Sequence, residues 1–377
     1  MAGRDFDLDI AVLAKPESAL PEVSSDSSSL ESPQRDARSD HGRIPWVVQR
    51  LHKQNYHPVL LIGSSAAGKT ALLLSLLAYF KQNPSSRIGA FFGQDLFRGD
   101  EVALYEDALQ FFNRSVAEFL GGETAAATRI GAPMFIPVRI NGSEQPEVRL
   151  AFIESEGEWF QPDPNLKSYY KPFRPDIEDL LGQYPEGISV IWVAPYAGSS
   201  CKASAYATAD PNAQTSVANE SLQGAMANYE ALRSQNCEKD SHIFLVTKWD
   251  NYKSQEITDI TSSLDRNNDP LIRSEVNSFL YQTYRGAFST FNAIKVPDSQ
   301  KSVFRYTAGA FRSRTSLPIA ATQETLLSYP RDMWNWLHRS VGIAHPEWNI
   351  GQRSLIPPPP PPKKSIWSLF DKLMEWL

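Results

Sequence analysis

The stretch "LLIGSSAAGKTALLLSLLAYF", from Leu60 to Phe80, decides the fold. An apolar run comes first, a short turn of small residues follows, and a second apolar run with helical spacing comes last. The turn fits the pattern G-x-x-x-x-G-K-S/T, whose fixed positions are Gly63, Gly68, Lys69 and Thr70. A strand, such a turn and a helix in this order predict an α/β fold with a phosphate-binding loop.

The residues of this loop have separate predicted tasks. Lys69 is expected to reach the β- and γ-phosphates, where it is also a candidate catalytic residue, and the Thr70 hydroxyl is expected to bind Mg²⁺. The turn is expected to hold the phosphates through its backbone, with the residues Gly63, Ser64, Ser65, Ala66, Ala67 and Gly68. The loop therefore predicts a nucleoside triphosphate with Mg²⁺, but it does not specify the base.

Composition and charge limit the class of protein. The chain has 377 residues, 42% of them hydrophobic, which is enough for one large core or two modest ones. Its formal net charge is -6, whereas nucleic-acid binders normally carry a basic surplus, so no nucleic-acid partner is expected. Two cysteines, Cys201 and Cys237, fit a reducing compartment, and the polar run around Cys237 predicts a surface thiol. The acidic N-terminus and the absence of a long uncharged apolar stretch predict a cytoplasmic protein.

Four segments are expected along the chain. Residues 1–43 are rich in Ser, Asp, Glu and Pro, which predicts a disordered N-terminal arm. Residues 44–350 are expected to form the P-loop domain, with insertions. A proline-rich linker, 351–362, leads to residues 363–377, whose apolar positions predict an amphipathic helix. We expect this helix to dock on a groove of a protein partner or of its own domain, and peripheral contact with a membrane surface is the less favoured alternative.

Alternating strands and helices are expected within the P-loop domain. The predicted strands lie at 57–63, 87–93, 133–140, 147–154, 187–196, 242–250 and 302–311. The predicted helices lie at 44–54, 68–82, 100–120, 269–288 and 331–348. A polar, small-residue stretch from 197 to about 221 predicts a loop, and Asn141-Gly142 predicts a hairpin. This alternation favours a mainly parallel central sheet in a three-layer P-loop NTPase fold.

A second motif, "LVTKWD" at Leu245 to Asp250, concerns the base. A buried strand that ends in Thr247-Lys248-x-Asp250 can direct the carboxylate at the edge of a purine, while the Lys248 stem packs along the base. Guanine offers a ring N1–H and an amine there, and these two donors match a carboxylate, which only accepts. Adenine has no N1–H and would leave the carboxylate unpaired. The motif predicts guanine, and a P-loop ATPase of another class is the alternative.

With these motifs, the chain resembles the translation-factor-like (TRAFAC) class of P-loop GTPases over about residues 59–311. The resemblance rests on "GSSAAGKT", on "TKWD" and on the strands between them, and some bacterial conflict-system GTPases carry similar long insertions. "YTAG", at Tyr306 to Gly309, stands where the class has its last motif. The resemblance therefore implies that Thr307 and Ala308 contact the guanine oxygen, and that the bound ligands are GTP or GDP and Mg²⁺.

The same resemblance gives roles to "ESEGE", residues 154–158. GTPases of this class usually have Asp-x-x-Gly here, in which the Asp holds a magnesium-bound water and the Gly N–H senses the γ-phosphate. Glu154 replaces that Asp, and Gly157 keeps the glycine. Glu158 stands where a water-orienting Gln is common and is the candidate base. These departures affect hydrolysis more than binding, so a nucleotide-loaded scaffold with little hydrolysis is an alternative to an active GTPase.

Relatives place a magnesium-sensing threonine before the strand that pairs with the Asp-x-x-Gly strand. Thr128 is the first candidate and Thr124 the second, and Arg129 is the candidate for a charge that stabilises the transition state. The resemblance thus predicts a GTPase switch that hydrolyses GTP to GDP and phosphate. Loops near Thr128 and Gly157 are expected to be ordered by the γ-phosphate and to signal to protein partners.

Overall fold

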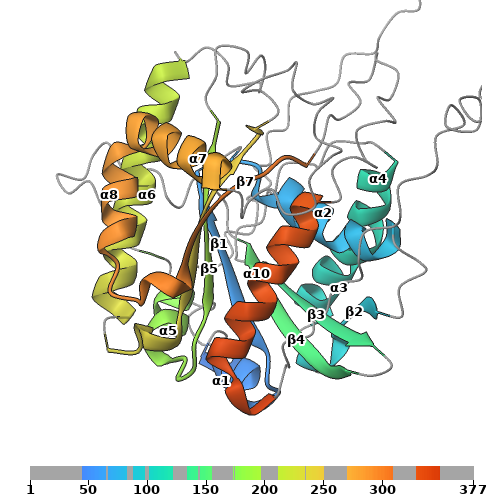
Figure 1. Ribbon diagram of the computed structural model, residues 1–377. Helices are drawn as coiled ribbons and strands as arrows, with labels where there is room; N and C mark the ends of the chain where they lie inside the picture. Colours follow the sequence, from blue (N-terminus) through green and yellow to red (C-terminus); the bar gives the residue numbers. More distant parts are fainter. Residues whose placement is uncertain are drawn as a thin grey trace, which may run out of the picture. The chain divides into compact units, whose positions relative to one another are not determined.

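The computed structural model describes twelve parts of the chain (Figure 1). They are residues 45–64, 67–82, 88–97, 102–121, 134–142, 145–154, 173, 175–196, 211–233, 235–249, 270–308 and 328–348. All of them belong to the unit His41–Leu377. The predicted N-terminal arm, proline-rich linker and C-terminal helix lie outside these residues.

A seven-stranded sheet forms the centre of this unit, with the strand order β2-β3-β4-β1-β5-β6-β7. Its strands are β1 (His57–Gly63), β2 (Ile88–Phe92), β3 (Met134–Gly142), β4 (Gln145–Glu154), β5 (Ser189–Pro195), β6 (Ser241–Thr247) and β7 (Lys301–Arg305). β3 is antiparallel to both of its neighbours, and the other pairings are parallel. The predicted mainly parallel α/β sheet is confirmed, and β1, buried along its whole length, lies between β4 and β5.

The predicted hairpin between β3 and β4 is present. The two strands pair from Met134 opposite Glu154 to Gly142 opposite Gln145, with an irregularity between Ile140 and Gly142. Asn141 and Gly142 belong to β3 itself, so the expected turn residues lie at the strand end. Through this hairpin β4 reaches β1 in parallel register, which places Glu154 beside Leu61 near the carboxyl end of β1.

Helices lie on opposite sides of the central strands in Figure 1, with α6 and α8 on one side and α2 and α10 on the other. Trp334 of α10 contacts Phe152 of β4, whereas Tyr229 of α6 contacts Trp192 of β5. The helices are α1 (Pro45–Lys53), α2 (Lys69–Gln82), α3 (Val102–Gln110), α4 (Val116–Leu120), α5 (Pro175–Gln183), α6 (Pro211–Arg233), α7 (Pro270–Thr283), α8 (Arg285–Ala293) and α10 (Ser328–Ala344). Among the residues described, no helix has the length and apolar character that crossing a bilayer requires.

Helix α6 corrects one prediction. The loop expected from 197 to about 221 is wrong for residues 211–221, which form the first half of this 23-residue helix. Its buried apolar side chains recur at helical spacing and are Ala218, Leu222, Ala225, Met226 and Tyr229. Pro211 begins the helix, where its missing N–H costs no hydrogen bond. The small and polar residues between these positions obscured the apolar stripe in the sequence.

Two predicted helices are present but interrupted. Residues 102–120 are helical, with a π-helical turn at Phe111–Ser115 between α3 and α4. The helix expected over 269–288 is divided into α7 and α8 at Tyr284, which leaves the helical conformation. The Tyr284 hydroxyl donates a 2.6 Å hydrogen bond to the carbonyl of Pro195. The break therefore lets a buried tyrosine fasten both helices to the carboxyl end of β5.

The prediction of a surface thiol at Cys237 is wrong. Its side chain is buried in the short 3-10 turn before β6, and Sγ donates to the carbonyl oxygen of Lys295 at 3.0 Å. Burial raises the pKa of the thiol, which keeps it protonated and a weak nucleophile. The nearest neighbours, Gln235, Asn236, Glu238 and Lys239, are exposed, while the cysteine is buried.

A buried ionic network joins α6 to the amino ends of β5 and β6. Arg233 and Asp240 are both 0% exposed, and the Arg233 guanidinium donates to the two carboxylate oxygens of Asp240 at 2.9 and 3.0 Å. The same guanidinium donates to the carbonyls of Leu181, Tyr184 and Glu186. Tyr229 donates its hydroxyl to Asp240 at 2.5 Å, and the Ile188 N–H donates to it at 2.8 Å. These contacts satisfy both charges inside the core.

Three histidines are buried near the amino ends of the strands. His57 Nε2 is 2.8 Å from the Ser189 hydroxyl, and its Nδ1 is 3.3 Å from Nε2 of His345. His242 accepts a 3.1 Å hydrogen bond from the indole of Trp192. Burial lowers the pKa of each imidazole, to about 3 for His242.

We expect these buried histidines to make the fold sensitive to mild acid. A histidine in the unfolded chain has a pKa of about 6.5, which is higher than in the folded protein. Protons therefore bind the unfolded chain in preference to the folded one. The free energy of unfolding should therefore fall as the pH drops through 6.5 and continue to fall toward the lowered pKa. Between pH 7.5 and 5.5, the expected loss is about 1 kcal/mol per buried histidine. Urea unfolding at the two pH values measures it.

His242→Phe isolates the effect. The quantity compared is the change in the free energy of unfolding between pH 7.5 and 5.5, so a change in stability that is the same at both pH values cancels. This variant should show a smaller pH difference than the wild type, because it lacks one of the buried histidines that take up a proton on unfolding. A free energy of unfolding that stays constant from pH 7.5 to 5.5 would contradict the prediction.

Candidate nucleotide-binding site

The phosphate loop connects the carboxyl end of β1 to the first turn of α2. β1 ends at Gly63, and α2 begins at Lys69, with the Leu72 N–H donating to the Gly68 carbonyl at 2.9 Å. A Cβ atom on Gly63 would lie 2.5 Å from the carbonyl oxygen of Val193 in β5, so only glycine fits there. Gly68 has a φ of +91°, a left-handed conformation that favours glycine. The backbone thus needs both glycines of the motif.

Lys69 is buried inside this loop. Its ammonium donates to the carbonyl oxygens of Gly63 at 2.8 Å and Ser64 at 3.1 Å, and its side chain is 6% exposed. Burial lowers the pKa of Lys69 to about 8, and the carboxylate of Glu154 opposes that shift. Lys69 therefore still carries a positive charge at pH 7, beside the N-terminus of α2, where backbone N–H groups favour an anion.

Glu154 and Thr70 meet at the same place. Glu154 ends β4 and is 1% exposed, and its Oε1 accepts a hydrogen bond from the Thr70 hydroxyl across a sequence separation of 84 residues. The structure therefore accommodates the longer side chain of glutamate at the position where the GTPases that the sequence resembles usually have aspartate. A hydroxyl and a carboxylate supply hard oxygen ligands, which suit Mg²⁺, since this ion keeps several waters and binds phosphates as well. The donor set fits the predicted ion.

The end of β6 is tied to the phosphate loop. Thr247 ends the strand, and its hydroxyl donates to the carbonyl oxygen of Ala67 at 2.5 Å. Trp249 is buried, and its backbone N–H donates to the carbonyl of Tyr306 at 3.2 Å. The motif Thr247-Lys248-Trp249 therefore lies between the loop and the chain that leaves β7. Asp250, its last member, lies outside the described residues.

Lys248 has an unusual backbone conformation. Its φ is +55°, whereas Asn55, which also has a positive φ, is a residue type that tolerates this region. A lysine in the left-handed region costs about 1–3 kcal/mol and persists where the surroundings impose it, most often at functional sites. The strained residue is the one that the motif assigns to the base.

The last predicted motif follows β7. The Tyr306 N–H continues the pairing with β6 by donating to the Val246 carbonyl at 2.7 Å. Thr307 is buried, and Ala308 packs, partly buried, against the core. The contact between Trp249 and Tyr306 therefore brings the two segments that the resemblance assigns to guanine next to each other in space.

Some predicted site residues have no described position. They are Ser65, Ala66, Thr124, Thr128, Arg129, Gly157, Glu158 and Asp250. The remaining ones lie at the carboxyl ends of β1, β4, β6 and β7, and the contacts of Lys69, Thr70 and Thr247 connect the ends of β1, β4 and β6. Lys69, Thr70 and Glu154 of the predicted phosphate and metal site are therefore described, whereas Arg129 and Glu158, the other candidates for hydrolysis, are not.

Sequence patterns missed an aromatic cluster beside the base motif. The Trp249 ring lies 6.2 Å from that of Tyr196 and 5.6 Å from that of Phe279, measured between centroids. The Tyr196 N–H donates to the carbonyl of Thr247 at 2.8 Å, which fixes the strand end from the β5 side. These residues come from three separate elements, and no spacing in the sequence relates them.

Comparison with known proteins gives distant structural likeness. No protein-family model matches the chain, and no curated protein matches its sequence. The chain is similar to a chain of the signal recognition particle receptor SRb-GTP/SRX complex from Chaetomium thermophilum, at 14% identity and a TM-score of 0.30, over 72% of this chain and 96% of that one. It is also similar to the Ski7 GTPase-like domain from S. cerevisiae, bound to GTP, at 13% identity and a TM-score of 0.30, over 74% of this chain and 50% of that one. Likeness at this level does not assign a function.

Proposed function

We propose that this protein binds GTP with Mg²⁺ at the phosphate loop, within a three-layer P-loop NTPase fold. The observation that carries the proposal is the buried ammonium of Lys69 inside the loop, next to the Thr70–Glu154 contact. Together they supply a cation for phosphate oxygens and two oxygen donors for a metal. Guanine is favoured by the Thr247-Lys248-x-Asp250 motif, the first part of which is tied to the loop.

The chemistry follows from these positions. Lys69 and the N-terminus of α2 neutralise charge on the β- and γ-phosphates, and Thr70 and Glu154 hold the metal. Bound Mg²⁺ supplies further charge neutralisation at the phosphate oxygens. In the proposed hydrolysis, water attacks the γ-phosphorus and the bridging oxygen leaves with GDP. From the sequence, Glu158 is the candidate base and Arg129 the candidate charge stabiliser.

We also propose that nucleotide state is passed to protein partners in the cytoplasm. Loops near Thr128 and Gly157 and the helix predicted at 363–377 are the candidate contacts. A nucleotide-loaded scaffold is the second candidate function, because Glu154 stands where aspartate is usual in the related class. Single-turnover release of phosphate from bound GTP separates the two, since a scaffold retains the triphosphate.

Asp250→Asn tests the choice of base. The amide presents a donor to the guanine edge, so the affinity for GTP should fall by about 100-fold, through the loss of charge-assisted hydrogen bonds. The affinity for xanthosine triphosphate should rise, because xanthine presents an acceptor where guanine has its amine. Competition between the two nucleotides for a fluorescent analogue measures both changes.

Glu238→Gln provides the matched control, because it removes one exposed carboxylate on the turn before β6. Its nucleotide affinities should equal those of the wild type. If Asp250→Asn binds GTP as tightly as the wild type, the guanine assignment is wrong, and an ATPase of another P-loop class becomes the better interpretation.

A further inference from the structure

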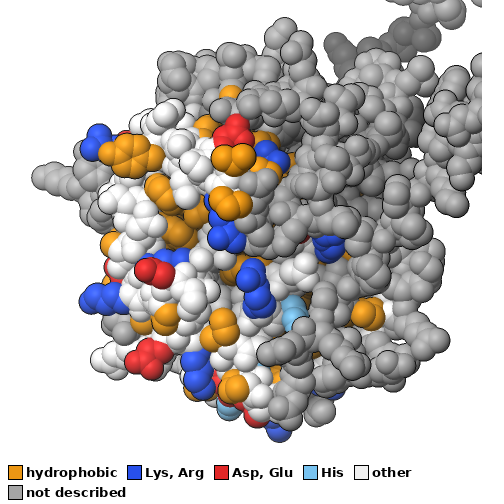
Figure 2. Space-filling model, viewed as in Figure 1, with side chains coloured by type: hydrophobic (Ala, Val, Ile, Leu, Met, Phe, Trp, Pro, Cys, Tyr) orange, Lys and Arg blue, Asp and Glu red, His pale blue; other side chains and the backbone are white. Residues whose placement is uncertain are grey.

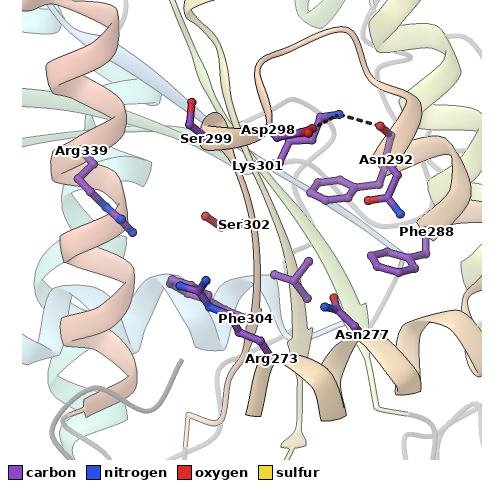
Figure 3. Close-up of a pocket in the computed structure, with 12 residues that line it drawn as sticks. Arg273, Asn277, Phe288, Asn292, Asp298, Ser299, Lys301, Ser302, Phe304 and Arg339 are labelled. Atoms are coloured by element: carbon purple, nitrogen blue, oxygen red, sulfur yellow. Dashed lines mark hydrogen bonds and ion pairs between the residues drawn. The ribbon is translucent and has the colours of Figure 1, made fainter. Parts of the chain in front are cut away.

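An open groove follows the outer side of β7, away from the nucleotide site. It is a hollow of about 810 Å³, to which α7, α8, β7 and α10 all contribute residues. In Figure 3 the strand runs through the middle, with Arg339 of α10 on one side and Asn277 of α7 and Phe288 of α8 on the other. The groove therefore has a strand as its floor and a helix along each wall.

The backbone of β7 offers hydrogen-bonding groups to this groove. In the described part of the chain, β7 pairs with β6 and ends the sheet. The Tyr306 N–H points to β6. Because alternate residues of a parallel strand bond to the same neighbour, the backbone N–H and C=O groups of Phe304 and Ser302 also point to β6. The N–H and C=O of Val303 and the C=O of Lys301 therefore point to the open side, while the Lys301 N–H donates to the Asp298 carbonyl in the turn before the strand. This is the arrangement to which another strand can add.

The groove is positively charged on an acidic protein. Among the described residues that line it, Arg273, Lys301 and Arg339 are basic and Asp298 is acidic, whereas the whole chain has a formal net charge of -6. Asp298 is fully exposed, and its 3.6 Å contact with Lys301 is a weak surface pair. Figure 2 shows Lys and Arg side chains on the face between α7 and α10. The charge of the groove is complementary to an acidic occupant.

Charged residues on edge strands often serve to prevent pairing, and the geometry of Lys301 argues against that role here. Its ammonium donates to the Asn292 carbonyl in α8 at 2.7 Å, which holds the side chain against the helix wall. Arg273 and Arg339 are exposed on helices that flank the strand. The cations therefore border the open edge without covering it.

We propose that this groove binds an extended acidic segment of a partner protein, which adds to the sheet as a strand alongside β7. The N–H and C=O of Val303 and the C=O of Lys301 supply ladder hydrogen bonds, which are independent of sequence. Because side chains alternate along a strand, acidic residues at every second position face Arg339 on one wall or Arg273 on the other. This site is separate from the nucleotide site and does not depend on its function.

Binding of short peptides to the full chain tests the proposal. The probe is a fluorescent pool of ten-residue peptides with Glu at alternate positions and varied apolar residues between them. A second pool carries Lys in place of Glu. A third keeps Glu but has proline at every apolar position, which removes the N–H donors of those positions and fixes their φ at about −65°, away from the value in a β-strand. The acidic pool should bind, and both other pools should bind at least about tenfold more weakly.

Charge reversal in the groove gives the matched variants. Arg273→Glu/Arg339→Glu should weaken binding of the acidic pool by about tenfold or more, and Arg285→Glu, at an exposed position of α8 outside the groove, should not. Hydrogen exchange at the Val303 amide should slow when the acidic pool is bound.

Several outcomes would overturn the proposal. These are no binding by the acidic pool, equal binding by the proline pool, or unchanged exchange at Val303. If inorganic phosphate displaces the fluorescent acidic pool as effectively as unlabelled acidic peptide does, the groove is a simple anion site. Sedimentation that shows self-association lost in the Arg273→Glu/Arg339→Glu variant would assign the groove to a second copy of the chain.

Discussion

Lys69→Met is expected to lower nucleotide affinity by about 100-fold, because it removes charge-assisted contacts worth about 1.5–3 kcal/mol each. The nucleotide-free protein should be at least as stable as the wild type. The buried ammonium has a pKa lowered to about 8 from its ordinary value, which means that the fold disfavours its charge at neutral pH. Methionine fills similar space without that charge, so binding and stability should change in opposite directions.

Titration with a fluorescent GTP analogue measures the affinity, and urea unfolding without nucleotide measures the stability. Lys81→Met is the matched control, since Lys81 is exposed at the other end of α2. Saturating nucleotide should stabilise the wild type and the control but not Lys69→Met. If Lys69→Met binds nucleotide normally, the phosphate site is wrong. A large loss of stability without nucleotide would instead make Lys69 a structural residue.

Arg233→Met is expected to cost about 3–5 kcal/mol of unfolding free energy, because it leaves the Asp240 carboxylate charged and buried without its partner. Both residues are 0% exposed, so water cannot replace the lost hydrogen bonds. The carbonyls of Leu181, Tyr184 and Glu186 lose their donor in the same step. Urea unfolding at pH 7 measures the loss.

Arg114→Met provides the contrast. Arg114 pairs with Glu118 one helical turn away, and its side chain is 69% exposed. Such a pair contributes about 0.3–0.5 kcal/mol, so this variant should remain close to the wild type. The double variant Arg233→Met/Asp240→Leu should lose less than the sum of its single changes. An Arg233→Met variant that unfolds like Arg114→Met would show that the network does not stabilise the core.

The sequence predicted much of the fold because the central strands are buried on both faces. β1, β5 and β6 appear as continuous apolar runs, and the loop motif fixes where β1 ends and α2 begins. Helix α6 was not among the predicted helices, and its first half was expected to be a loop, because its buried stripe is made partly of alanines. Whether an alanine is buried depends on the neighbouring helix and strands, and a local pattern does not contain that information.

The residues of the site that belong to sequence motifs were predicted. The contacts that depend on the register between strands were missed. Lys69 and Thr70 follow from the spacing of the loop, and Glu154 from its position at the end of a strand. The bond from Thr247 to Ala67 and the position of Tyr196 beside Trp249 depend on how β1, β5 and β6 align. A shift of one residue would turn these side chains to the other face, and the apolar runs do not specify the register.

The hydrogen bond between Thr247 and Ala67 has a consequence for selectivity under the proposed function. It spans from the loop after β1 to the end of β6, across β5, through atoms of the protein alone. The fold of the protein therefore sets the distance between the phosphate loop and the start of the base motif at Thr247. A ligand must match this length as well as the charge and the base, and a molecule with the right ends at the wrong separation is rejected.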